Sequence, residues 1–203
     1  MLQIKSFVFG PFQTNTYVVW NDQGHVLMID PACSNEWEQK ALLDYINSLI
    51  FPLSSFNIIA THGHLDHLWG AKWACDQWST PVLMHEADIP MAQAMQAQYN
   101  MFGVARKAEP FEIQTLAPEL IPLKPEIITT PGHTPGSVCL YFPDEHVLFS
   151  GDTLFCMGYG RTDLPGGNMG QLIQSLEKLF LLPSVTRVYP GHGDTTTIGA
   201  ECR

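Results

Sequence analysis

Three histidines and one aspartate lie within the segment THGHLDH, residues 61–67. His62 and His64 are two positions apart, so in extended chain their side chains point to the same side and can share one metal ion at about 2.0–2.1 Å. Asp66 and His67 are displaced from that pair by the turn, and crowding all the candidate ligands around one tetrahedral ion would be sterically poor. The spacing therefore predicts two neighbouring ions rather than one.

Three further residues with metal-binding side chains lie in other segments: His133 in PGHTPGS, Asp152 in SGDTLF and His192 in YPGHGD. We expect His133 to complete the first ligand set and His192 to complete the second. Asp152 can bridge the two ions, because the two oxygens of a carboxylate can hold ions about 3.5–4 Å apart. Taken singly, each residue has an ordinary structural interpretation, Asp66 as a helix N-cap and the histidines as surface or turn residues. The cluster as a whole favours a metal site.

The elements that must position these side chains read as alternating strands and helices. A helix capped by Asn35 is expected to run to about Leu49, a second follows His67, and the Met-, Gln- and Ala-rich segment 88–111 should contain another. Each ligand-bearing segment comes at or just after the end of a predicted strand, where loops can converge on one point. No linker is evident, so residues 1–203 should form a single domain. The predicted strands are 2–9, 15–20, 25–30, 56–61, 81–84, 126–130, 137–142, 146–152 and 186–190, and an amphipathic helix is expected over 169–180.

The composition argues against several kinds of partner. Lys and Arg number 10 and Asp and Glu number 20, which gives a formal charge of −10. Nucleic acids and anionic membranes attract basic surfaces, so we expect neither as a partner. The sequence has five cysteines and no CxxC, no signal peptide at its N-terminus, and no apolar run approaching the length of a membrane span. These features favour a cytoplasmic protein.

The run from His62 to His67, followed by His133, Asp152 and His192, resembles the HxHxDH…H…D…H signature of the metallo-β-lactamase superfamily. It looks most like the glyoxalase II-like thioester hydrolases, and the resemblance covers essentially the whole chain. It implies a mixed α/β (α+β) fold, a four-layer αββα sandwich with a dinuclear site at one edge. An aspartate at the bridging position is unlike true metallo-β-lactamases and similar to glyoxalase II, lactonases and tRNase Z. The implied ligands are His62, His64 and His133 for the first metal, and Asp66, His67 and His192 for the second, with Asp152 bridging.

This resemblance implies a metallo-hydrolase acting on an acyl thioester of the S-lactoylglutathione type. Two divalent ions, zinc first with iron or manganese as alternatives, lower the pKa of bound water towards about 7, so that hydroxide can attack the acyl carbonyl. Asp66 and Asp152 are the expected catalytic residues, and Asp66 could orient the hydroxide. The positive ions favour an anionic substrate. A thiolate leaves with little proton assistance, whereas an amine does not, and this difference favours thioesters over amides.

Two residues of the segment GYGRTD, Tyr159 and Arg161, are the predicted substrate contacts. In glyoxalase II a basic residue at the position of Arg161 contacts the glutathione moiety. A structural pairing of Arg161 with Asp163 or with the loop of Asp152 is equally consistent with the sequence. Asp163 stands where that family has an aromatic contact. Only 11 residues follow His192, where glyoxalase II has a helical region that binds glutathione. The segment 88–111 could supply an apolar wall or lid instead. The alternative is that several of its apolar side chains simply pack a helix onto the domain.

Three alternative functions stay open on the sequence. A mononuclear iron persulfide dioxygenase also has HxHxDH, and a GRTD after the aspartate, which Arg161, Thr162 and Asp163 match. A lactonase would use the same ligands. A non-catalytic metal-binding module on an enzyme scaffold is disfavoured, because all seven ligand positions are filled. Metal content, measured with the turnover of S-lactoylglutathione and of a glutathione persulfide, distinguishes these functions.

Overall fold

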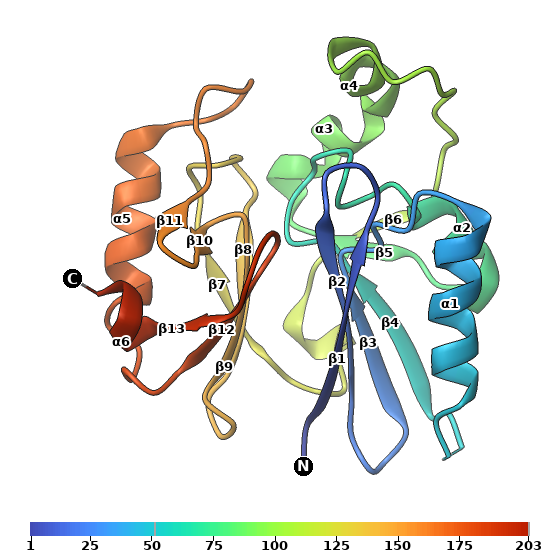
Figure 1. Ribbon diagram of the computed structural model, residues 1–203, viewed down its shortest axis with the longest axis horizontal. Helices are drawn as coiled ribbons and strands as arrows, with labels where there is room; N and C mark the ends of the chain where they lie inside the picture. The colour runs from blue at the N-terminus through green and yellow to red at the C-terminus, as the bar shows by residue number, and fades with distance from the viewer. Residues whose placement is uncertain (51, 203) are drawn as a thin grey trace.

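Two β-sheets packed face to face form the centre of the molecule, and helices cover their outer faces (Figure 1). The computed structural model describes residues 1–50 and 52–202. The first sheet has six strands in the order β1-β2-β3-β4-β5-β6. Their bounds are β1 Gln3–Phe9, β2 Thr14–Trp20, β3 His25–Ile29, β4 Ser55–Ile59, β5 Val82–Met84 and β6 Ile113–Thr115.

The second sheet has five strands in the order β13-β12-β9-β8-β7, and a two-stranded ribbon of β10 and β11 accompanies it. Their bounds are β7 Glu126–Thr129, β8 Val138–Phe142, β9 Val147–Gly151, β10 Leu154–Phe155, β11 Gly158–Tyr159, β12 Arg187–Pro190 and β13 Thr196–Thr197. Strands β12 and β9 are parallel, whereas β8 is antiparallel to both β7 and β9. The carboxyl ends of β7, β9 and β12 therefore lie at one edge of this sheet.

Six α-helices among the described residues complete the layers. Helices α1 and α2 lie against the first sheet and α5 and α6 against the second, while α3 and α4 sit above the first sheet (Figure 1). Each of these helices is too short or too polar to cross a membrane. The helices are α1 Glu36–Asn47, α2 Ala71–Trp78, α3 Ile89–Gln93, α4 Met95–Met101, α5 Met169–Leu179 and α6 Ile198–Glu201, with 3₁₀ turns at Glu86–Asp88 and Pro118–Leu120.

The central strands β3, β8 and β9 are buried and mostly apolar on both faces, because the sheets are covered on both sides. Tyr17 and Leu27 point into the core between the two sheets, where Tyr17 packs edge-on against Phe149 of β9 with ring centroids 5.1 Å apart. The neighbouring Val18 and Met28 point the other way, into the core beneath the helices. This alternation confirms the expected four-layer αββα sandwich.

Most of the predicted elements are present, with two differences that bear on the site. Asn35 caps α1 as predicted, since its side chain accepts hydrogen bonds from the backbone of Trp37 and Glu38. The helix expected directly after His67 instead begins at Ala71, after a series of turns. Gly70 explains the delay, because its amide donates to the carbonyl of Pro31 at 2.7 Å and a Cβ there would lie 2.3 Å from Cys33 Sγ. The segment 88–111 contains two short helices, α3 and α4.

Candidate metal centre

The structure brings all seven predicted ligands together at one end of the two sheets. Their donor atoms form three overlapping groups, and within each group the atoms lie within 4.8 Å of one another. Two of the groups match the predicted sets for the first and second ions, and Asp152 lies with one histidine of each. The groups are His62, His64 and His133; His62, His67 and Asp152; and Asp66, His67 and His192.

Three atoms of this cluster are buried and make no hydrogen bond among the described residues: His62 Nε2, and the pair His67 Nε2 and Asp152 Oδ1, which lie 3.3 Å apart, at ion-pair distance only. A buried polar atom without a partner is costly, and nearly all such atoms in folded proteins are satisfied. All three belong to the same group of donor atoms. The residues therefore fit a metal ion, which would supply the missing partner to all three at once.

In four of the histidines the protein holds Nδ1, and Nε2 is directed into the cluster, where a metal ion could bind. Each Nδ1–H can donate to an oxygen, which fixes the tautomer and the orientation of the ring. The Nδ1 partners are Thr61 Oγ1 for His62 at 3.1 Å, Asp30 Oδ2 for His67 at 2.8 Å, the Arg161 carbonyl for His133 at 2.7 Å, and the Phe12 carbonyl for His192 at 3.1 Å. His64 differs, because its Nδ1 faces His133 Nε2 at 2.8 Å.

Asp30 forms hydrogen bonds that hold His67 and the start of the loop carrying His62. It was not among the predicted site residues. It lies at the end of β3, is 1% exposed and has a φ of 54°. One carboxylate oxygen accepts from the amide of Thr61 at 2.7 Å, and the other accepts from Thr61 Oγ1 and from His67 Nδ1, both at 2.8 Å. Its position directly after a strand is the same signal that marked the other loops.

Asp88 joins the two loops that carry the first ligand set, and sequence reasoning also missed it. Its fully buried carboxylate accepts from the amide of Gly63 at 2.8 Å, from Thr134 Oγ1 at 2.7 Å and from the amide of Gly136 at 2.6 Å. Gly63 lies between two predicted ligands, and Thr134 follows a third. A Cβ at Gly136 would lie 2.7 Å from the carboxylate, so the loop needs glycine there. No local pattern in the sequence marks Asp88.

Burial keeps two histidines of the first ligand set in the neutral form. Burial lowers the pKa of His62 well below its usual value, and it lowers the pKa of His64 to about 4. Both imidazoles are therefore neutral at pH 7, which is the form that binds metal.

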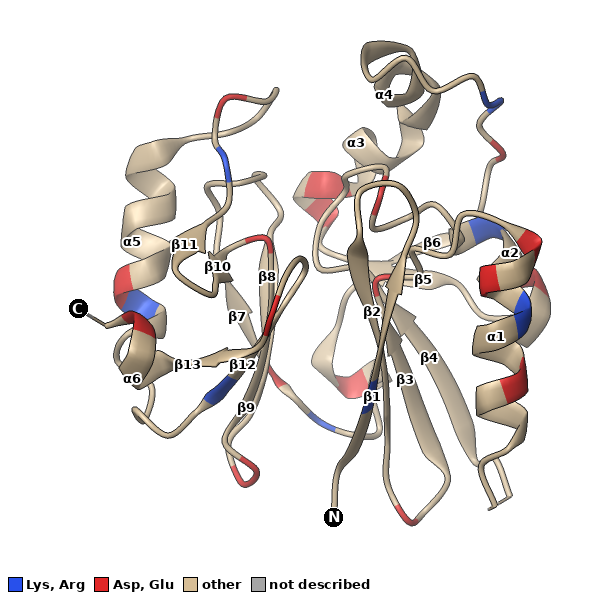
Figure 2. Ribbon diagram, viewed as in Figure 1, with Lys and Arg blue, Asp and Glu red and all other residues tan. Residues whose placement is uncertain are grey.

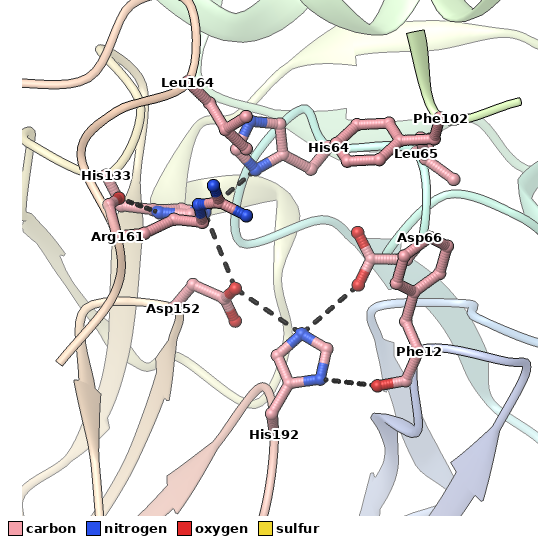
Figure 3. Close-up of a pocket in the computed structure, with 10 residues that line it drawn as sticks. All are labelled: Phe12, His64, Leu65, Asp66, Phe102, His133, Asp152, Arg161, Leu164 and His192. Atoms are coloured by element: carbon pink, nitrogen blue, oxygen red, sulfur yellow. Dashed lines mark hydrogen bonds and ion pairs between the residues drawn. The ribbon is translucent and has the colours of Figure 1, made fainter. Parts of the chain in front are cut away.

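In the second ligand set, carboxylates and histidines shift each other's pKa values in opposite directions. Burial acts to raise the pKa of Asp66, but the neighbouring His67 and a hydrogen bond from His192 hold it at about 2. Burial likewise opposes the increase at His192, where hydrogen bonds to Asp152 and Asp66 raise the pKa to about 9. Figure 3 shows both carboxylates directed at the His192 ring, whose Nε2 lies 3.2 Å from Asp66 Oδ2 and 3.5 Å from Asp152 Oδ2. The two carboxylates beside the His192 ring favour a positive charge at this position, and a bound metal ion would supply one.

A pocket opens directly above the cluster (Figure 3). Five predicted ligands reach it, and apolar side chains form its walls. It is lined by Phe12, His64, Leu65, Asp66, Phe102, His133, Asp152, Arg161, Leu164 and His192. Tyr159 lies elsewhere, in a separate hollow lined by Leu154, Met157 and Leu176 among others, so its position lends no support to the predicted substrate contact.

Arg161 lines the pocket, but its charge is already paired. Its Nε and Nη2 donate to the two carboxylate oxygens of Asp163, each at 2.6 Å, in a bidentate pair exposed to solvent. Of the two possibilities that the sequence left open, the structure has the ion pair. Figure 2 shows Lys and Arg at scattered positions along the ribbon, interspersed with Asp and Glu.

The fold and the site together define the class of protein. The sequence pattern of the metallo-beta-lactamase superfamily matches residues 9–192, and the chain belongs to that superfamily. Among curated proteins it is 32% identical over 215 residues to the hydroxyacylglutathione hydrolase GloC of Haemophilus influenzae, covering 100% of this chain and 96% of the relative.

Two solved structures show the same fold over nearly their whole length. A crystal structure of TTHA1623 in a di-iron-bound form is 35% identical with a TM-score of 0.85, covering 98% of this chain and 97% of the other. The crystal structure of the BLEG-1 B3 metallo-beta-lactamase is 34% identical with a TM-score of 0.86, covering 98% and 96%. The protein is thus a member of a metallo-hydrolase superfamily with a His/Asp cluster suited to metal ions.

Proposed function

We propose that the protein is a dinuclear metal-dependent hydrolase of thioesters, with zinc as the metal and S-lactoylglutathione as the first substrate to test. The observation that carries the proposal is the position of Asp152 between the two donor sets. Its Oδ1 lies 3.3 Å from His67 Nε2, and its Oδ2 lies 3.5 Å from His133 Nε2 and 3.5 Å from His192 Nε2. A carboxylate placed in this way suits two adjacent ions. The name of the GloC relative and the di-iron form of TTHA1623 support it.

Side chains that line the pocket would orient the attacking water and shield the reacting bond from bulk solvent. When bound, two divalent ions polarise a carbonyl and make hydroxide available near neutral pH. Asp66 is held by a hydrogen bond of 2.8 Å from Thr14 Oγ1 to its Oδ2, which directs the carboxylate to the pocket, where it can orient an attacking water. Phe12, Phe102 and Leu164 limit the access of bulk water to the reacting bond.

The choice of a thioester rests on the leaving group. Among the described residues that line the pocket, each histidine and aspartate belongs to a donor set, and Arg161 is paired with Asp163. Among these described residues, no group is left to protonate a departing amine. A thiol with a pKa near about 8.5 leaves as the anion and needs no such group.

We therefore expect a matched thioester to be hydrolysed at least about 10²-fold faster in kcat/KM than its amide analogue, the smallest usual contribution of a general acid. The measurement uses one acyl group on a thiol and on the corresponding amine, with the zinc-loaded protein and a chelator-treated control. Equal rates for the two compounds would contradict the proposal.

The likeness to BLEG-1, named as a B3 metallo-beta-lactamase, makes β-lactam hydrolysis the second candidate. A β-lactam is a cyclic amide, so it serves as a further amide compound in the same assay. Faster turnover of a β-lactam than of every thioester would favour this second function. One iron per chain, with oxygen uptake on a glutathione persulfide, would favour the dioxygenase alternative instead.

The pairing of Arg161 leads to a prediction about anionic substrates. We expect Arg161→Gln to change kcat/KM for S-lactoylglutathione less than about fivefold, because an exposed ion pair contributes roughly 0–1 kcal/mol and the contact to His133 comes from the backbone. Asp163→Asn, which frees the guanidinium, should lower KM for the same substrate. Steady-state kinetics of both variants check this, and a loss above about 100-fold in Arg161→Gln would show that the guanidinium binds substrate directly.

A further inference from the structure

An apolar hollow adjoins the main pocket on the side of His64, and we refer to it as the side pocket. Its walls come from α3, α4 and the loop before α5: Met91, Met101, Phe102, Leu164 and Pro165. His64, Phe102 and Leu164 line both hollows. A substrate whose scissile bond lies over the donor sets would therefore place one of its two substituents in the side pocket.

The side pocket offers no charge to that substituent. None of the residues that line it is Lys, Arg, Asp or Glu, and its one amide side chain, Gln98, is fully engaged elsewhere. Gln98 Nε2 donates to the carbonyls of Gly63 at 3.0 Å and Met91 at 2.9 Å, and its Oε1 accepts from the amide of Leu65 at 3.0 Å. A carboxylate or ammonium group placed here would lose its hydration without gaining a partner, which is costly.

The walls are built from side chains that adapt to apolar ligands. Met101 is 58% exposed and Phe102 is 38% exposed, although methionine and phenylalanine are usually buried. Methionine is flexible and polarisable, and it is common on surfaces that bind apolar groups of varied shape. Phe102, which lines both hollows, also packs edge-on against Phe12 of the main pocket, with ring centroids 5.9 Å apart.

On these grounds we propose that the substrate carries an uncharged apolar group, aliphatic or aromatic, next to the scissile bond, and that the side pocket binds this group. The proposal rests on the proposed thioesterase function and narrows its substrate class. Thioesters of small apolar acids or thiols suit the site better than S-lactoylglutathione, because glutathione carries carboxylate and ammonium charges and Arg161 is already paired.

Binding can be tested without turnover. The probes are two homologous series with a metal-binding head group, n-alkanoic acids from acetate to octanoate and n-alkanethiols from ethanethiol to octanethiol, titrated into the zinc-loaded protein by calorimetry. We expect Kd in one series to fall about fourfold for each added methylene until the pocket is full, from the usual transfer free energy of a methylene. A fall in the acid series assigns the pocket to the acyl group, and a fall in the thiol series assigns it to the leaving group.

Two matched variants locate the effect. Met101→Gln should reduce the dependence of Kd on chain length, whereas Met157→Gln, an exposed methionine in the separate hollow near Tyr159, should leave it unchanged. A Kd that does not depend on chain length in either series would overturn the proposal, as would an equal effect of the two variants.

Hydrolysis of the corresponding thioesters separates this proposal from the proposed function. Thioester turnover together with a Kd independent of chain length would reject the side-pocket proposal and leave the thioesterase function standing. Chain-length-dependent binding without turnover of any thioester would reject the thioesterase function and leave the pocket's preference for apolar groups standing.

Discussion

Replacement of Asp152 with alanine should lower kcat/KM for a thioester by at least about 10³-fold, because metal ions contribute several kcal/mol to stabilising charge in the transition state. Asp152 lies within hydrogen-bond or ion-pair distance of histidines from both donor sets, so no other described residue can take its place between them. The metal content of the purified variant, measured by mass spectrometry, should fall from two ions per chain to one or none.

The matched control for this variant is Asp144→Ala. Asp144 is exposed in the turn between β8 and β9, at the opposite end of β9 from Asp152, and its removal should change neither metal content nor kcat/KM. If the Asp152→Ala protein kept both ions and lost less than about tenfold in kcat/KM, the dinuclear site bridged by Asp152 would be wrong.

Replacement of Asp88 with alanine should destabilise the protein by about 3 kcal/mol, since it leaves the buried amides of Gly63 and Gly136 without an acceptor at about 1–3 kcal/mol each. The Thr134 hydroxyl would lose the carboxylate and keep only Ser137 Oγ, 2.7 Å away. For a chain of this length the expected decrease in Tm is roughly 6–12 °C. The affinity for metal should fall about 10- to 100-fold as well, because Gly63 and Thr134, which Asp88 holds, are neighbours of the first ligand set. Thermal unfolding of the chelator-treated protein and a zinc titration measure the two effects separately.

A second substitution and a control sharpen this prediction. Asp88→Asn keeps the shape of the side chain but turns an NH₂ group towards a backbone amide or the Thr134 hydroxyl, so its metal affinity should also fall. Asp76→Ala removes an exposed carboxylate that pairs with Lys72, and its Tm should remain close to that of the unmodified protein. A Tm for Asp88→Ala within about 2 °C of the unmodified protein would show that the two loops do not depend on this carboxylate.

Much of the candidate site could be predicted because its signals are local. The two-residue spacing of His62 and His64 is a property of extended chain, and Asp66 and His67 follow within the same turn. The other three ligands were recognisable because each follows a strand, and strand ends of parallel elements meet at one edge. The same periodicity predicted the two apolar sheets and the capped helix α1.

Other features depend on which segments the packing brings together, and no local pattern carries that information. The start of α2 at Ala71 depends on the contact of Gly70 with Pro31 and Cys33. Asp88 reads as one polar residue in a helical segment, yet its partners Thr134 and Gly136 are 46 and 48 positions away.

The sequence by itself indicated the superfamily, through the resemblance of its histidine and aspartate pattern, and it predicted the seven candidate ligands and their division into two sets. Side-chain type and spacing limit which atoms can bind one ion. The tertiary structure decided how those ligands are held and what surrounds them: Asp30 and Asp88 beneath the loops, Arg161 committed to Asp163, Tyr159 in a different hollow, and an apolar side pocket between α4 and Leu164. The physical reason is that hydrogen bonds and pockets form between segments far apart in the chain, and their partners are chosen only when the two sheets and their helices pack.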